Sequence, residues 1–175
     1  MPQQIPTFAE LLAATHFTAL HMEMRDHYQV DEEADDMARW RETGVRDVDP
    51  TSPGWGPWIS KVRDATARGV AVQRVRIVSE PTSDYIRYEH AGTDMNTLAG
   101  EEVRWLPRTK ASDLCLPGND FWVFDDRLVR FHYFAGDGQW LYDDLRDEAH
   151  VIKLCRDSFE AVWGRAVPHA DYRIR

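Results

Sequence analysis

The clearest pattern of hydrophobic and polar positions lies in the middle of the chain. Apolar residues recur every three or four positions from Pro57 to Ala65, which predicts an amphipathic helix that begins at the proline and ends near Gly69. Residues 70–78 are dominated by valine and isoleucine, which is typical of a strand covered on at least one face. A second strand is predicted at about 102–106. Because a helical crossover separates the two strands, we expect them to be parallel.

The crossover itself and the second half of the chain carry further signals. Two short helices are predicted at 84–92 and 94–99, with Ser83 as the first cap. Residues 120–142 predict an antiparallel hairpin meander, because aromatic and β-branched runs flank Asp125-Asp126 and a glycine-rich turn follows. An apolar stripe from about 147 to 166 predicts a final helix.

The first 56 residues give weaker signals. Thr7 and Glu10 fit a capping box that opens a short helix. Residues 16–28 alternate in a way that suggests a strand, although a helix also fits. The acidic run 31–36 predicts the solvated start of a helix, favoured over a cation or partner site. We interpret the chain as a single domain over 1–175, with an N-terminal helical and strand extension (1–56) and a core (57–166).

The charge balance and the hydropathy limit the classes of function that we expect. Thirty acidic residues against 21 Lys and Arg give a net charge of -9. Phosphate binding depends on clustered basic residues, so we expect no direct nucleic-acid binding. The alternative requires several arginines to share one face: Arg63, Arg68, Arg74, Arg76, Arg104 and Arg108. No apolar run reaches bilayer length and the N-terminus does not resemble a signal peptide, so we expect a cytoplasmic protein without membrane contact.

Motifs for metals, cofactors and common catalytic groups are missing from the sequence. Cys115 and Cys155 stand alone, and His16 and His21 lack the i, i+4 spacing of a metal pair. Glycine-rich phosphate loops and a GxSxG nucleophile motif are also absent. We therefore expect no cofactor, no metal and no catalytic residue of these types.

Carboxylates interleaved with arginines are the candidate ligand-binding residues. They follow the first predicted parallel strand, open the second and enter the hairpin, and we expect several of them to converge at the carboxyl ends of the strands. Such a set either forms a buried ion-pair network, which we favour, or binds a polar ligand. The candidates are Glu80, Asp84, Tyr85, Arg87, Glu89, Glu101, Arg104 and Asp120.

Three segments resemble one half of the phospholipase D-like fold: ATARGVAVQRVRIV (65–78), AGEEVRWLP (99–107) and GNDFWVFDDRLV (118–129). The resemblance implies an α/β (α+β) fold, with a mixed sheet that has parallel core strands, an antiparallel meander and flanking helices. It also implies a His-x-Lys-x4-Asp motif. Counting back from Asp125, however, Gly118 and Asp120 stand where the histidine and lysine belong. Phospholipase D-type chemistry needs both groups, so we expect a catalytically empty scaffold.

The whole chain also resembles a family of short, functionally uncharacterised actinobacterial proteins. The motifs are SEPTSDYIRYE (79–89), AGEEVRWLPR (99–108) and DFWVFDD (120–126). This resemblance implies a gene neighbourhood with small helix-turn-helix regulators. We therefore predict a non-enzymatic regulatory or protein-interaction protein, with a protein partner for which a helix-turn-helix transcriptional regulator is the candidate. The alternative is a small-molecule-binding protein or enzyme that uses a carboxylate and arginine pocket.

Overall fold

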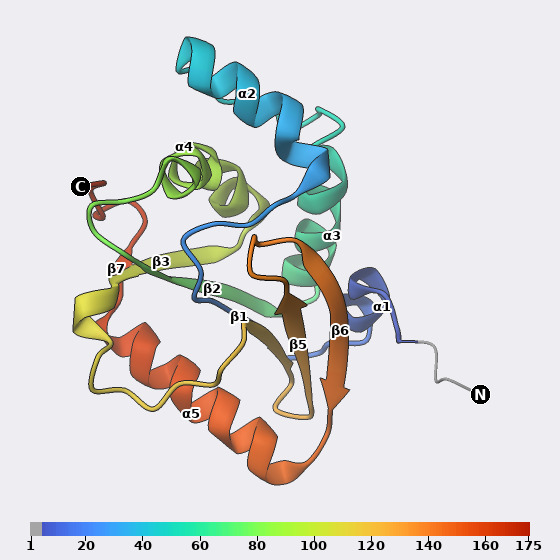
Figure 1. Ribbon diagram of the computed structural model, residues 1–175. Coiled ribbons are helices and arrows are strands. Elements are labelled where there is room, and N and C mark those ends of the chain that lie inside the picture. Colours follow the sequence, from blue (N-terminus) through green and yellow to red (C-terminus); the bar gives the residue numbers. More distant parts are fainter. Residues whose placement is uncertain (1–4) are drawn as a thin grey trace.

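One mixed sheet organises the chain (Figure 1), and the computed structural model describes residues 5–175. The strands are β1 (Thr18–Glu23), β2 (Ala71–Val78), β3 (Glu102–Pro107), β4 (Phe121–Phe124), β5 (Leu128–Phe134), β6 (Trp140–Arg146) and β7 (Val167–Pro168). The helices are α1 (Phe8–Ala13), α2 (Ala34–Thr43), α3 (Gly56–Ala67), α4 (Asp84–Ala99) and α5 (Ala149–Arg165), with 3-10 turns η1 (Asp31–Glu33) and η2 (Arg108–Lys110). The sheet order is β6-β5-β4-β1-β2-β3-β7.

The centre of the sheet is β1, which pairs in parallel with β2 and antiparallel with β4. The expected parallel pairing of β2 with β3 is confirmed, and so is the meander of β4, β5 and β6. The fold is thus the predicted single mixed α/β domain. The predicted N-terminal extension over 1–56, however, contains the central strand, so the sheet is not built from residues 57–166 alone.

Helices cover both faces of the sheet (Figure 1). On one face, α5 packs against β1 to β5, and its apolar side joins the strands in one aliphatic and aromatic cluster. On the other face, α1 and α3 cover one end of the sheet and α4 covers the other end. Two separate apolar clusters form there, the first around Val62 and Trp122 and the second around Tyr88 and Trp105. The gap between these two clusters is the site described below.

Local sequence signals explain several boundaries. Thr7 and Glu10 form the expected capping box at the start of α1. Gly44 and Gly69 adopt positive φ after α2 and α3, a conformation that glycine reaches without steric cost. Asp125 sits in the β4–β5 turn with a φ of 53°, and its carboxylate accepts backbone N–H bonds from the segment that leads into β1. These hydrogen bonds therefore link the hairpin turn to the central strand.

One prediction about local structure was wrong, and one short strand was missed. The two short helices expected at 84–92 and 94–99 are one continuous helix, α4. Gly92 does not break it, because tertiary packing and the Ser83 cap outweigh the low helix propensity of one glycine. The short strand β7 was not predicted, since two residues leave no periodic signal. Within residues 5–175, no helix has the length and apolar character needed to cross a membrane.

Candidate functional site

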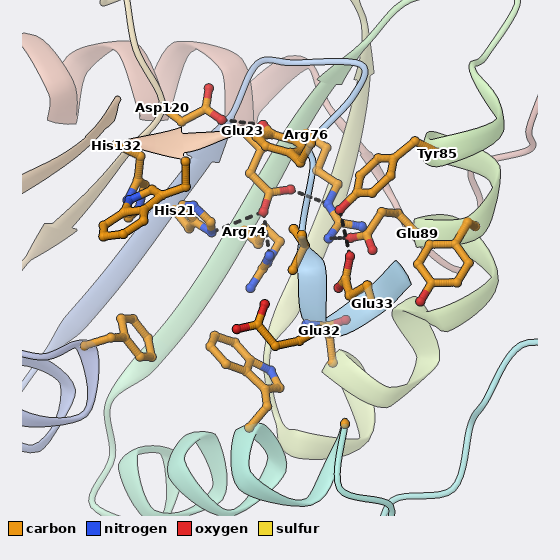
Figure 2. A pocket seen from close by; sticks show the side chains of 18 of the residues that line it. His21, Glu23, Glu32, Glu33, Arg74, Arg76, Tyr85, Glu89, Asp120 and His132 are labelled. Atoms are coloured by element: carbon orange, nitrogen blue, oxygen red, sulfur yellow. Dashed lines mark hydrogen bonds and ion pairs between the residues drawn. The ribbon is translucent and has the colours of Figure 1, made fainter. Parts of the chain in front are cut away.

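A cavity of about 530 Å³ lies on the face of the sheet opposite α5. The polar floor comes from alternate residues of the sheet: His21 and Glu23 in β1, and Arg74 and Arg76 in β2. Figure 2 shows these side chains between η1 on one side and the sheet on the other. The cavity falls within the range of about 300–1,000 Å³ that small-molecule sites occupy.

A network of buried ion pairs forms the floor. Arg74 donates to Glu23 Oε1 at 2.6 Å and to Glu101 Oε1 at 2.7 Å. Arg76 bonds the other oxygen of Glu23 and also reaches Glu89 on α4 (Figure 2). Each arginine therefore bridges two carboxylates, and Glu23 in turn bridges both arginines. The exposed fractions of Arg74 and Arg76 are 8% and 4%, so this network is shielded from water.

The charged groups of the network stabilise each other's ionised forms. Burial opposes the charge on Glu23, but Arg76 and Arg74 outweigh that effect and lower the pKa of this carboxyl. Burial likewise opposes the charge on Arg76, and Glu23 and Glu89 overcome it and raise its pKa. Asn96 donates to the second oxygen of Glu101 at 2.7 Å, which completes the hydrogen bonding of that buried side chain. The floor is consequently a fixed array of charges.

The walls of the cavity are rich in aromatic side chains. Trp58 stacks on Phe8, and its indole lies 5.2 Å from the Arg74 guanidinium carbon. Trp122 stacks on His21 with the ring centroids 4.2 Å apart. The aromatic residues that line the cavity are Phe8, Tyr28, Trp55, Trp58, Tyr85, Tyr88, Trp122, Phe134 and Trp140. These walls offer ring faces to a ligand over a charged floor.

Two carboxyl groups of the lining are partly protonated near neutral pH. Burial, together with repulsion from Glu89, raises the pKa of Glu33 to about 7. Burial also raises the pKa of Asp120 to about 6, although hydrogen bonds from Tyr28 and from the Met24 backbone favour its charged form. Both carboxyl groups therefore ionise at a higher pH than an exposed carboxyl group does.

The segment that runs from η1 to the start of α3 closes one side of the cavity. Arg46 pairs with Asp36 and stacks over the ring of Tyr88, with 3.8 Å between its guanidinium carbon and the ring centroid. Gly92 of α4 faces this segment, because a Cβ there would lie 2.9 Å from Arg46 Nε and 3.0 Å from Trp55. A glycine at this position thus permits the close approach of Arg46 and Trp55.

At the opposite rim, three side chains contact the carboxylate of Asp143 in β6. Arg130 Nε and Trp140 Nε1 each donate to it at 2.9 Å, and His132 Nδ1 lies 2.6 Å from its carboxylate. Burial disfavours the charge on Asp143, but the bonds from His132, Trp140 and Arg130 outweigh burial and lower its pKa to about 2. This aspartate fixes the orientation of three residues that line the cavity.

Four of the eight predicted site residues belong to this site. Tyr85, Glu89 and Asp120 line the cavity, and Glu101 lies beneath its floor as the partner of Arg74. Asp120 approaches from the loop before β4, and Tyr85 and Glu89 come from α4 (Figure 2). Within residues 5–175, no group of three or more His, Cys, Asp or Glu side chains has the arrangement of a metal site.

The other four predicted residues lie elsewhere, and the expected convergence of Glu80, Glu89 and Glu101 was wrong. Glu80 accepts a bond from Tyr172, and Arg104 contacts the Trp163 ring. Glu80 follows the end of β2, whereas Glu101 precedes the start of β3. Because the two strands are parallel, these positions lie at opposite edges of the sheet. The remaining two candidates, Asp84 and Arg87, are exposed on α4.

Sequence reasoning missed the centre of the site. His21, Glu23, Arg74 and Arg76 alternate with apolar residues along β1 and β2, which is the pattern of a strand with one solvated face. In the structure this polar face is covered by helices and by the segment from η1 to α3. The signal that could have indicated the site is a pair of charged residues at i, i+2 in each of two neighbouring central strands.

The fold and the site define a mixed α/β domain with a ligand-sized cavity on one sheet face. Residues 6–174 match the family model described as "Domain of unknown function (DUF6879)", and the chain belongs to this family. The expected membership of a family of unknown function is thereby confirmed. None of the curated proteins matches the chain.

Two solved structures that match the chain do so at low sequence identity. NucT from Helicobacter pylori is 13% identical, with a TM-score of 0.51 over 91% of this chain and 87% of that chain. TrmBL2, described as an archaeal chromatin protein with a novel mode of DNA binding, is 13% identical with a TM-score of 0.48. The match covers 90% of this chain, which spans about half (47%) of TrmBL2.

The comparison with TrmBL2 corrects one prediction. We expected no direct nucleic-acid binding from a net charge of -9, yet a protein described as binding DNA is among the matches. Net charge is an average over the whole surface, whereas phosphate contacts depend on local clusters of basic residues, so the charge gave no ground for that exclusion. The likeness itself is too low to argue that this chain binds DNA.

Proposed function

We propose that this protein binds a small organic molecule in the cavity on the sheet face. The observation that carries the proposal is the pairing of a buried, fixed charge network with an open aromatic-walled space of about 530 Å³. Concave, largely aromatic sites with a few fixed polar groups are the usual form of small-molecule sites. This corresponds to the alternative of a pocket-based function that the sequence left open.

The energetic cost of the arrangement supports a binding role. Replacing a buried ion-pair network by well-packed apolar residues is often neutral or stabilising, so such a network is weak evidence for stability. Charged groups retained beside an empty space are more typical of a functional site. Three buried donors of residues that line the cavity, Arg46 Nε, Trp58 Nε1 and Arg130 Nη1, also have no hydrogen-bond partner within residues 5–175. Buried polar groups without a partner are uncommon in a purely structural core and are more typical of functional sites.

We also propose that the fold is phospholipase D-like and that its catalytic positions are empty. The likeness of fold to NucT supports the first part. For the second part, Asp120 stands at the expected lysine position, and its carboxylate is engaged by Tyr28 and the Met24 backbone. Turnover of bis(4-nitrophenyl) phosphate by repurified protein, lost in Asp120→Asn, would contradict this. A regulatory role, for which ligand binding would supply a signal, stays a prediction.

Two residues of β6 allow a matched test of ligand binding. Trp140 and Tyr142 are 53% and 55% exposed, but only Trp140 lines the cavity. The irregularity in the β5–β6 pairing places Trp140 opposite Phe134 and Tyr142 opposite Tyr133. A thermal-shift screen of small organic cations, neutral compounds and anions would supply ligands. We expect Trp140→Ala to weaken their binding about tenfold and Tyr142→Ala to leave it unchanged.

The outcomes of this test are clear. Loss of affinity in Trp140→Ala, with wild-type affinity in Tyr142→Ala, supports the proposed function. A second cavity variant, Trp122→Leu, should also weaken binding, and calorimetry on each folded variant separates affinity from stability. The proposal would be overturned if the screen found no compound that binds. It would also be overturned if no cavity variant changed the affinity of the compounds found.

A further inference from the structure

The charges that line the cavity do not balance. Seven carboxylates and four arginines face it. Every one of the arginines already has a carboxylate partner: Arg46 with Asp36, Arg74 with Glu23 and Glu101, Arg76 with Glu23 and Glu89, and Arg130 with Asp143. An anionic ligand would therefore find no arginine without a partner. It would also have to approach an excess of negative charge.

Two of the surplus carboxylates belong to consecutive residues of η1, the exposed Glu32 and the half-buried Glu33. Glu33 makes its hydrogen bond with the hydroxyl of Tyr85 at 3.1 Å, and Glu89 lies across from it. Glu32 has no hydrogen-bond or ion-pair partner within residues 5–175. Figure 2 shows both side chains in the cavity, with Glu33 on the side of Arg76 and Glu89. Their carboxylates offer acceptor oxygens that the protein itself leaves unneutralised.

The aromatic walls suit the same kind of ligand. Tyr85 and Tyr88 lie beside Glu33, and Trp55 and Trp58 line the adjoining wall. A cation placed over an aromatic face is attracted by the electron-rich face of the ring, and more strongly when water is excluded. The protein's own arginines already use these walls, since Arg46 stacks over Tyr88 and Arg74 lies over Trp58.

We infer that the ligand is an organic cation: a protonated amine or quaternary ammonium group on an aromatic or apolar body. Glu33 and Glu32 hold the positive charge, and the aromatic walls enclose the body. This inference rests on the proposed function, because it specifies the chemical class of molecule that the cavity takes.

The environment of Glu33 gives the inference a pH signature. Glu33 faces Glu89 and Tyr85 of α4, Arg76 of β2 and Arg46 of the segment after α2. Burial and Glu89 raise its pKa to about 7, so a bound cation would favour ionisation and lower that pKa. By linkage, binding of a permanent cation then releases protons, and its affinity rises as the pH increases from 6 to 8.

Three probes with one body and different charges test the inference: benzyltrimethylammonium, benzyl alcohol and phenylacetate. Isothermal titration calorimetry on the full chain gives their affinities at pH 6, 7 and 8. We expect benzyltrimethylammonium to bind at least about tenfold more tightly than the other two. Because this cation does not titrate, any pH dependence belongs to the protein.

A matched pair of variants locates the charge contact. Glu33→Gln should lower the affinity for benzyltrimethylammonium about tenfold and reduce its rise between pH 6 and 8 to the part that Asp120 contributes through its own pKa of about 6. Glu42→Gln makes the same change in net charge at an exposed position of α2 that does not line the cavity, and should bind as wild type. Equal effects of the two variants would indicate non-specific attraction by an acidic protein and overturn the inference.

The remaining outcomes separate this inference from the proposed function. If benzyl alcohol or phenylacetate binds and the cation does not, the inference fails while ligand binding in the cavity stands. If none of the three binds although the screen yields ligands that depend on Trp140, the inference again fails alone. If the screen itself yields no ligand, both fail.

Discussion

The two faces of the central strands differ in what they bury. Ile77 of β2 points towards α5 and joins a continuous cluster with residues such as Phe121 and Phe159. Its neighbour Arg76 points the other way, into the ion network under the cavity. Both side chains are almost fully buried, with exposed fractions of 1% and 4%. One strand thus serves a dry core and a charged site at once.

This difference indicates that one face of the sheet supplies stability and the other face holds the charged site. The face covered by α5 is close-packed and apolar, so burial of its surface supplies most of its stabilising free energy, at about 25 cal/mol per Å². On the other face, two apolar clusters leave a charged gap between them. The cost of burying charge in that gap is offset by the free energy that the α5 face and the flanking clusters supply.

The largest expected effect comes from breaking the ion network. Arg76→Met should cost about 3–5 kcal/mol, because it leaves Glu23 and Glu89 buried without this partner. The loss should grow as pH rises from 4 to 8, since the stranded carboxyls are better tolerated when protonated. Urea unfolding at several pH values measures both effects.

A control for that variant lies on the neighbouring strand. Arg104 has no carboxylate partner within residues 5–175 and contacts the Trp163 ring and carbonyl. Arg104→Met should therefore cost no more than about 1 kcal/mol, at all pH values. Similar losses of unfolding free energy in the two variants would show that the loss in Arg76→Met does not come from breaking the ion network.

The next largest effect concerns the dry face. Ile77→Ala should cost about 3 kcal/mol, because it removes buried methyl groups and leaves a cavity against α5. Unlike the loss in Arg76→Met, this loss should not change between pH 5 and 8. Affinity of the cavity for its ligand should also stay at the wild-type value, and a tenfold change measured by calorimetry would argue against separate roles for the two faces.

A smaller effect reports on Glu33. Its folded pKa of about 7 lies above the ordinary value of 4.5, so the folded state holds this proton more tightly and wild-type stability loses free energy as pH rises through this window. Glutamine does not titrate. The stability of Glu33→Gln relative to wild type should therefore increase by on the order of 1 kcal/mol from pH 5 to 8, a figure discounted for the partial exposure of Glu33.

Taking the difference between variant and wild type also isolates Glu33 from other groups. The buried His21 has a lowered pKa, and its contribution to stability changes with pH in the opposite direction. That contribution cancels in the difference. A difference that stays flat in thermal melts from pH 5 to 8 would contradict the assigned environment of Glu33.

The smallest effect is expected at Arg87, a residue that the sequence placed in the site. Arg87 is exposed, and its side chain makes one long bond, from Nε to Thr82 at 3.4 Å. Arg87→Met should change stability by less than about 0.5 kcal/mol and leave ligand affinity unchanged. A loss of several kcal/mol would restore the original interpretation of Arg87 as a network residue.

The sequence predicted the elements of this protein better than its site. Helix α3, strands β2 and β3 and the hairpin around Asp125 follow from local patterns of apolar spacing, capping and turn residues. Tyr85, Glu89, Glu101 and Asp120 were identified as candidates because they belong to segments in which carboxylates and arginines alternate next to the ends of predicted strands. Glu80 and Arg87 fit the same rule and failed, since a rule about proximity along the chain does not specify which edge or face a residue occupies.

By itself, the sequence determined the single mixed α/β domain, the parallel pairing of β2 with β3 and the antiparallel meander, because these depend on periodicity and on the order of elements. Only the tertiary structure decided that β1 is the central strand, and hence that His21 and Glu23 face Arg74 and Arg76. The reason is physical: alternating polar residues predict one polar face of a strand. Whether that face meets water, another charge or a cavity depends on pairings between residues about fifty positions apart.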